Sequence, residues 1–268
     1  MQNINVPFSS MPFYIQGIPI VVGLITLSLV FIFVARRYAI YSSSKTELVS
    51  LYSNGTGVLY SVLLALITVN AWDDFNQVDS YIESEAYTLG DVYRETLGYP
   101  QPVGEVLRKG LRSYVNTILD EEWKMLRSGS GSTAARPAIN KVQKDLIGYE
   151  PKTQTQYIMH EQLIANLNSA LHFHRQIVSS TDESVMPLLW AVVWIGAIIN
   201  LFINALSTSG SLTIDCILGG SFSLTIGLVI LLVYGLDHPF LGDFHVSEAP
   251  YIQLMQFMDS IDASLKEP

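Results

Sequence analysis

Four long apolar segments constrain the fold of this chain more than any other feature. They cover residues 17–35, 57–72, 187–206 and 214–236. A helix needs roughly 20 residues to cross the hydrocarbon core of a bilayer, and the shortest segment, 57–72, can be extended through Leu51 and Tyr52. Lipid offers no partner to a free backbone amide, so each segment must be helical. The sequence therefore predicts an all-α integral membrane protein with four transmembrane helices.

The composition supports a membrane protein and excludes several other classes. Charged residues make up only 15% of the 268 residues, well below the roughly 25% of soluble domains, so an ordinary cytosolic enzyme is not expected. The net charge of -9 argues against a nucleic-acid partner, which would require a basic surface. Cys216 is the one cysteine, which excludes an internal disulfide and a cysteine-based metal cage.

The segments divide the chain into two membrane hairpins and a large polar insert. We expect an N-terminal tail (1–16), a first hairpin (17–72), an extramembrane helical domain (73–185), a second hairpin (186–238) and a C-terminal tail (239–268). The first segment has no Lys or Arg before it and is longer than a signal-peptide core, so we expect it to be retained.

The orientation in the membrane depends on three basic residues. Arg36, Arg37 and Lys45 lie between the first two segments, whereas the N-terminal tail and residues 73–93 hold no Lys or Arg. Basic loops stay in the cytoplasm, so we expect this loop inside, and both termini and the insert outside.

The insert has helical periodicity throughout. Apolar residues continue beyond Trp72 at spacings of three and four, which predicts that the second membrane helix extends as one rod to about Gly98. Further helices are expected over 103–127, from Pro137 onward and over 153–180. Such faces fit either an intramolecular bundle or a parallel oligomer around an axis, and the sequence leaves both open.

Several short motifs resemble those of the bacterial bestrophin-like family. The exit of the fourth segment reads LDHPFLGDFHVS from Leu236 to Ser247, and WDDF from Trp72 precedes ESEAYTLGDVYR from Glu83. A further stretch, DEEW, begins at Asp120. The family usually has Arg at the position of His238. The resemblance covers about residues 17–255 and implies a multi-pass protein of the bacterial plasma membrane, a channel-like homo-oligomer and no transferable catalytic residues.

The strongest chemical signal is a run of carboxylates after the second membrane segment. Asp73, Asp74, Asp79 and Glu83 would form a ring of negative charge if several copies of the helix surrounded an axis, and such a ring concentrates cations. This would oppose the anion selectivity that the family resemblance invites. The same residues also fit a solvated helix face in an acidic protein.

The second membrane segment carries candidate pore-lining residues. We expect apolar constrictions and polar contacts from the following positions: Val62, Leu66, Thr68, Val69 and Asn70. Leu63 with Leu66, or Val62 with Val69, are alternative constrictions, and ordinary helix packing is the competing interpretation.

Polar residues within the other membrane segments are further candidates. Asn200 and Asn204 are four apart and are expected to face protein or water, chiefly for interhelical hydrogen bonding. Asp215 and Asp237 flank the fourth segment. Asp215 suits a helix start, and Asp237 suits a structural exit that is tied to an arginine of another helix. Gly219, Gly220 and Gly227 would allow close helix approach.

No motif predicts an enzyme or a bound cofactor. The three histidines of the last insert helix, His160, His172 and His174, lack the spacing of a zinc helix, so a metal site is left open but not favoured. We expect an oligomeric ion-conducting membrane protein whose partners are lipid, inorganic ions and its own copies. The alternative is a non-conducting, membrane-anchored interaction or sensory module.

Overall fold

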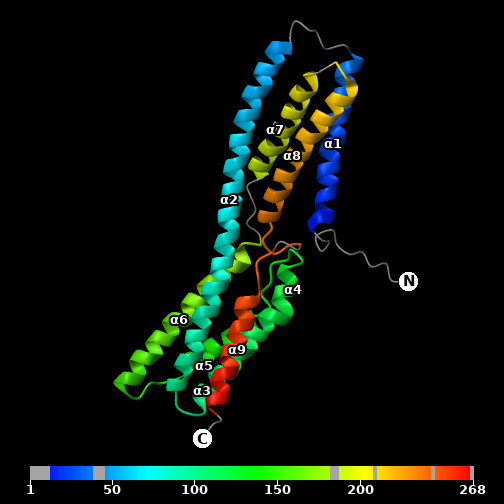
Figure 1. The fold of residues 1–268 in the computed structure, drawn as a ribbon. Coiled ribbons are helices and arrows are strands. Elements are labelled where there is room, and N and C mark those ends of the chain that lie inside the picture. Colours follow the sequence, from blue (N-terminus) through cyan, green and yellow to red (C-terminus); the bar gives the residue numbers. More distant parts are fainter. Residues whose placement is uncertain (1–12, 39–45, 182–186, 208–209, 243–244, 266–268) are drawn as a thin grey trace, which may run out of the picture. The chain divides into compact units, whose positions relative to one another are not determined.

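The computed structural model describes residues 13–38, 46–181, 187–207, 210–242 and 245–265. Within these ranges the chain is helical, with no strand (Figure 1). The N-terminal tail up to residue 12 and Lys45, one of the three basic residues behind the expected orientation, lie outside the described residues. The chain divides into two compact units, which we describe separately.

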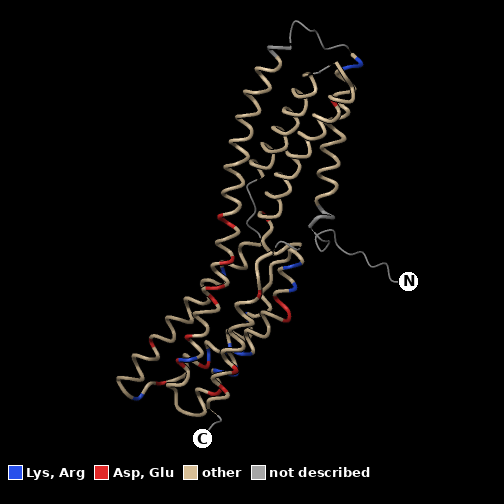
Figure 2. Tube along the Cα trace, in the orientation of Figure 1, with Lys and Arg blue, Asp and Glu red and all other residues tan. Residues whose placement is uncertain are grey.

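Unit 1 contains four helices that are long and apolar enough to cross a membrane. They are α1 (Phe13–Arg37), the first part of α2 (Thr46–Glu95), α7 (Pro187–Leu206) and α8 (Leu212–Leu236). This confirms the predicted membrane helices. Figure 2 shows that acidic and basic residues gather on unit 2 and are rare along these four helices, as the hydrocarbon core requires.

The core of unit 1 is a cluster of aliphatic side chains around Tyr60. Its members come from all four helices: Leu24, Tyr60, Leu64, Ile67, Val193, Ala197, Leu201, Ile226, Ile230 and Val233. The Tyr60 hydroxyl donates to the carbonyl of Val193 at 3.1 Å, which satisfies the one polar atom of this side chain.

Small residues bring α1 and α8 close together. A Cβ built on Gly219 would lie 2.6 Å from Ile32 Cδ1, and one on Gly227 would lie 3.3 Å from the Cα of Val21. Ser28 adds a hydrogen bond from its hydroxyl to the carbonyl of Gly219 at 3.1 Å. The predicted role of Gly219 and Gly227 is therefore confirmed, whereas Gly220 faces open space.

Unit 2 is a helical bundle of the rest of α2, α3 (Val103–Thr117), α4 (Trp123–Leu126), α5 (Arg136–Ile147), α6 (Gln154–Ser179) and α9 (Ala249–Ser264). A 3-10 turn (Thr96–Gly98) ends α2, and a π-helical turn (Ile118–Glu122) joins α3 to α4. Helices α3 to α6 lie between residues 103 and 179. Helix α9 was not predicted, because only a tail was expected after residue 238.

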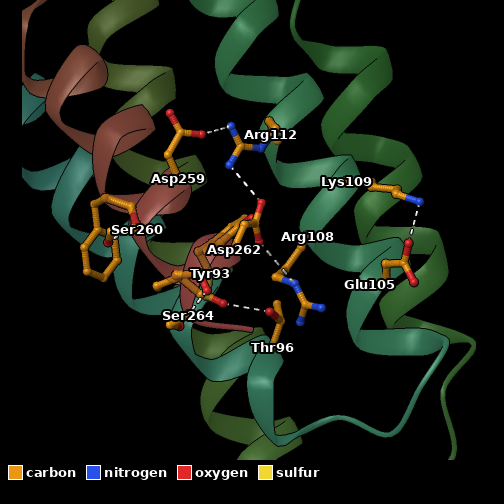
Figure 3. A network of polar contacts seen from close by, with 12 residues as sticks. Tyr93, Thr96, Glu105, Arg108, Lys109, Arg112, Asp259, Ser260, Asp262 and Ser264 are labelled. Atoms are coloured by element: carbon orange, nitrogen blue, oxygen red, sulfur yellow. Dashed lines mark hydrogen bonds and ion pairs between the residues drawn. The ribbon is translucent and has the colours of Figure 1, made fainter. Parts of the chain in front are cut away.

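Polar contacts attach α9 to α2 and α3 (Figure 3). Arg112 donates to Asp259 at 2.6 Å and to Asp262 at 2.9 Å, and the Tyr93 hydroxyl donates to Asp262 at 2.8 Å. Arg108 lies 3.7 Å from Asp262. Asp262 is thus the residue on which three donors converge.

Candidate functional site

Two glutamates lie in the centre of unit 2. Glu85 on α2 and Glu122 in the π-helical turn are both fully buried, with 0% of each residue exposed. A buried carboxylate is strongly unfavourable unless donors surround it. The π-helical turn is an irregularity of a kind that often accompanies functional positions, and here it carries one of the two carboxylates.

His174 on α6 lies between the two glutamates. Its Nδ1 is 3.2 Å from Glu85, and its Nε2 is 3.0 Å from Glu122 Oε1. Neutral imidazole carries one N–H and would direct a lone pair at one of these carboxylates. Since both nitrogens face negative oxygen, the doubly protonated imidazolium is the form that this geometry favours. We call Glu85, Glu122 and His174 the buried triad.

Two tyrosines and a backbone amide complete the coordination of the carboxylates. Tyr114 and Tyr251 donate to Glu85 at 2.8 Å and 2.7 Å, and the amide of Ala135 donates to Glu122 at 3.1 Å. Glu122 Oε1 has no hydrogen bond of good geometry to a described residue, so its contact with His174 is an ion pair by distance.

The surroundings shift the ionisation of this cluster. Burial lowers the pKa of His174, but the negative charge of Glu85 and the close contacts with Glu122 and Glu85 outweigh it and raise the pKa to about 10. Burial, and then the charge of Glu85, raise the pKa values of Tyr114 and Tyr251 well above the usual value. The cluster can therefore hold a proton on His174 across the physiological range.

The three members of the buried triad share a periodicity signal in the sequence. Each member occupies an apolar register of its own helix: Glu85 follows Ile82 by three, Glu122 follows Ile118 by four, and His174 precedes Ile177 by three. The apolar stripe of a helix faces the core, so a charged side chain within that stripe is expected to be buried. The periodicity could thus have marked these residues as buried, but not that they meet.

Four of the five candidate pore residues lie on one face of α2 in unit 1. Val62, Leu66, Val69 and Asn70 are exposed in the single chain, whereas Thr68 is half-buried and donates to the carbonyl of Leu64 at 2.8 Å. Leu63 packs against the core cluster instead. Among the two predicted constrictions, only the pair Val62 and Val69 has both members exposed.

The candidate acidic residues remain accessible on α2. Asp73 and Asp74 of unit 1 are exposed, as is Glu83 of unit 2, and Asp79 is half-buried. Glu83 lines a groove of about 280 Å³ together with Tyr87, Arg94 and Phe257. No group of three or more His, Cys, Asp or Glu residues suited to a metal ion occurs in the described ranges.

Three of the four polar candidates in the membrane helices have hydrogen-bond partners within unit 1. Arg36 of α1 pairs with Asp215 of α8, with Nε and Nη2 at 3.2 Å and 2.5 Å from Oδ2. Asp237 accepts from the indole of Trp190 at 3.0 Å, a donor that the sequence did not predict. Asn200 is buried and donates to the carbonyl of Gly196 at 2.9 Å, and Asn204 is half-buried.

The other two histidines of α6 lie apart from the buried triad. His160 forms a hydrogen bond through Nδ1 with the Tyr99 hydroxyl at 2.8 Å, and burial lowers the pKa of His160. His172 is exposed. The three histidines therefore do not converge on one site, as their spacing along the helix indicates.

Comparison with known protein families identifies the family of this chain. A bestrophin-like domain matches residues 10–251, which is most of the sequence. The chain belongs to the bestrophin-like family. None of the curated proteins matches it in sequence.

Solved structures share the fold of this bestrophin-like chain. A point mutant of a bacterial bestrophin homologue from Klebsiella pneumoniae has a TM-score of 0.67 at 11% identity, and the match covers 92% of this chain and 99% of that one. The homologue phased with zinc gives 0.66 at 11% identity, with 94% and 99% covered. A variant of a protein described only as a membrane protein gives 0.64 at 12% identity, with 94% and 100% covered.

The family motifs have visible structural roles in this bestrophin-like protein. Within unit 1, His238 contacts the carbonyl of Tyr234 through Nδ1 at 3.0 Å. Within unit 2, Phe240 packs edge-on against Trp123, with the ring centres 5.8 Å apart, and Trp123 also contacts Tyr251. Two members of the buried triad, the glutamates, also lie in the quoted motifs. The motifs thus mark core contacts, and membership supports a non-enzymatic role in general terms.

Proposed function

We propose that this protein forms a homo-oligomeric ion channel whose pore is lined by α2. The observation that carries the proposal is Asn70. Its amide lies on the exposed face of α2 beside Val69 and Leu66, and no hydrogen bond links this side chain to another described residue. An unsatisfied amide is costly in lipid. A water-filled axis between several copies would hydrate Asn70 and remove the cost.

The aliphatic residues on the same face fit the narrow part of such a pore. Val62, Leu66 and Val69 are each more than half exposed, at 55%, 63% and 56%. A ring of these side chains would form a hydrophobic constriction, which can gate by expelling water. An acidic mouth that favours cations would be formed by the carboxylates on α2: Asp73, Asp74, Asp79 and Glu83.

A cysteine scan tests the pore directly. Cys216 is the only cysteine, so Cys216→Ser provides a clean background. Val62→Cys, Leu66→Cys and Asn70→Cys, measured in planar bilayers, should lose most of their current when a charged, membrane-impermeant thiol reagent is added. Ile198→Cys on the exposed face of α7 is the matched control and should be unaffected. Equal sensitivity at Ile198, or none at the α2 positions, would disprove the α2 pore.

Ion selectivity tests the acidic mouth separately. Asp79→Asn with Glu83→Gln should reduce the cation-to-anion permeability ratio in liposomes under opposed potassium and chloride gradients. The double change Glu121→Gln with Glu150→Gln removes the same charge from other exposed positions of unit 2 and should leave the ratio unchanged. An anion current that neither pair of changes alters would support the channel but contradict the acidic mouth, and the carboxylates would then be only a solvated helix face.

The alternative function is a membrane-anchored module that conducts nothing. The size of the helical unit 2 favours it, because a minimal pore needs no such domain. Absence of flux from a folded, reconstituted oligomer would establish this alternative, and a strictly monomeric protein in detergent would exclude the shared axis.

A further inference from the structure

A second cavity in unit 2 lies beside the buried triad. It has a volume of about 420 Å³ and lies between α5, the segment before it, and α6. This size is within the range of small-molecule sites. His174 contributes to its lining, while the two glutamates that hold His174 are fully buried and do not. The cavity is distinct from the α2 face used in the proposed function.

Two arginines that pair with no described carboxylate line the cavity. Arg136 opens α5 and Arg175 lies on α6 directly after His174, and neither forms an ion pair with any residue that the structure describes. Three other arginines of unit 2, Arg94, Arg108 and Arg112, each have an acidic partner within 4.0 Å, whereas Arg127, which does not line the cavity, has none among the described residues. The cavity thus presents two guanidiniums whose N–H groups are not used by a described carboxylate.

The remaining polar groups of the cavity are uncharged hydrogen-bonding groups. Asn140 and Gln143 line it with side-chain amides that have no bond to another described residue, and the same holds for the Thr133 hydroxyl. Ser132 accepts from the amide of Ala134 at 3.1 Å, so its own hydroxyl hydrogen is available. No Asp or Glu is among the described residues that line the cavity. A cation would therefore meet only positive and neutral groups, whereas an anion would meet two forked guanidiniums and several donors.

We infer that this cavity binds a small phosphate-type anion, either free phosphate or a phosphate monoester. Two guanidiniums from different helices, with hydroxyl and amide donors, offer more N–H and O–H groups than the two oxygens of one carboxylate accept. A tetrahedral dianion can accept from both helices at once. The aliphatic side chains of Ile139, Leu171 and Val178 would contact an apolar body attached to the phosphate.

Binding is tested on the full chain in detergent, with inorganic phosphate and glycerol 3-phosphate as probes in isothermal titration calorimetry. We expect saturable binding, with Kd raised at least tenfold by Arg136→Gln and by Arg175→Gln. Arg127→Gln removes an exposed arginine of the same unit that does not line the cavity, and it should bind like the parent. Both cavity arginines are exposed, and circular dichroism of each variant verifies folding.

Two further experiments identify which molecule carries the phosphate group and whether the cavity distinguishes phosphate from a carboxylate. Binding to vesicles that contain phosphatidic acid, lost in the same variants and absent with soluble probes, would assign the phosphate to a lipid headgroup. Malonate binding as tight as phosphate would overturn the phosphate assignment. No saturable binding by any phosphate probe, or equal loss in Arg127→Gln, would overturn the site. None of these readouts depends on ion flux, so they are independent of the channel proposal.

Discussion

His174 Nε2 lies 3.0 Å from Glu122 Oε1, while the opposite ring nitrogen lies 3.2 Å from Glu85. One imidazole therefore links α6 to α2 and to the turn between α3 and α4. This cross-link of three segments is electrostatic: the two glutamates are buried, and 14% of the His174 side chain is exposed where it lines the cavity.

Removal of the imidazole should destabilise unit 2 strongly. His174→Gln retains hydrogen-bonding capacity but leaves two buried carboxylates without a cation, and breaking such a group costs about 3–5 kcal/mol. Urea denaturation of the detergent-solubilised protein, followed by circular dichroism, measures the loss. His172→Gln changes an exposed histidine of the same helix and should shift the free energy of unfolding by less than about 0.5 kcal/mol. Similar losses in both variants would contradict the central role of His174.

Stability should fall as the pH rises from 6.5 toward 10. The pKa of His174 is raised in the folded state from 6.5 to about 10, so the stabilisation is complete below pH 6.5, where both states carry the proton. Above that, the unfolded state loses its proton first, and the stabilisation is lost as the pH approaches 10. Glu85, Glu122 and the Tyr114 ring contact His174, and Arg136 and Arg175 line the same cavity. Tyr114 and Tyr251, which donate to Glu85, have pKa values raised well above their usual value.

The pH effect is measured as the urea midpoint between pH 6 and pH 10. In His174→Gln the fall over this interval should largely disappear. A slope that persists unchanged in this variant would assign the pH dependence to other groups.

The attachment of α9 should depend on Asp262 more than on Asp259. Asp262 accepts from Tyr93 and Arg112 and is one-third exposed, whereas Asp259 is mostly exposed, at 67% of its side chain, and pairs with Arg112 alone among the described residues. Asp262→Asn should cost about 1–3 kcal/mol, and Asp259→Asn about 0–1 kcal/mol. Hydrogen exchange of the α9 amides is the readout. The reverse order would show that the exposed pair is the anchor.

Close packing of α1 on α8 should not tolerate a large side chain at Gly227. A Cβ there already approaches the Cα of Val21 at 3.3 Å, so Gly227→Leu should destabilise by about 1–3 kcal/mol through overpacking. Gly220→Leu is the control on the same helix, because a Cβ at Gly220 meets nothing within 4 Å. Thermal unfolding in detergent compares the two, and equal melting temperatures would refute this packing.

Local patterns in the sequence determined the helices of this protein, because apolar length and periodicity are properties of a single segment. The prediction for 187–206 coincides with α7, and the periodicity beyond Trp72 matches α2, which continues to Glu95. The missed helix α9 carries Tyr251, Leu254 and Met258 at the same spacing, so its periodicity could have been used in the same way.

Only the tertiary structure decided which charges meet. Glu85 and His174 are 89 positions apart, and Arg36 and Asp215 are 179 apart. No pattern within one helix can specify such pairs, since they depend on how separate helices pack. The sequence could mark Glu85 and Asp215 as charges in apolar surroundings, but the cation that stabilises each of them was brought there by the fold.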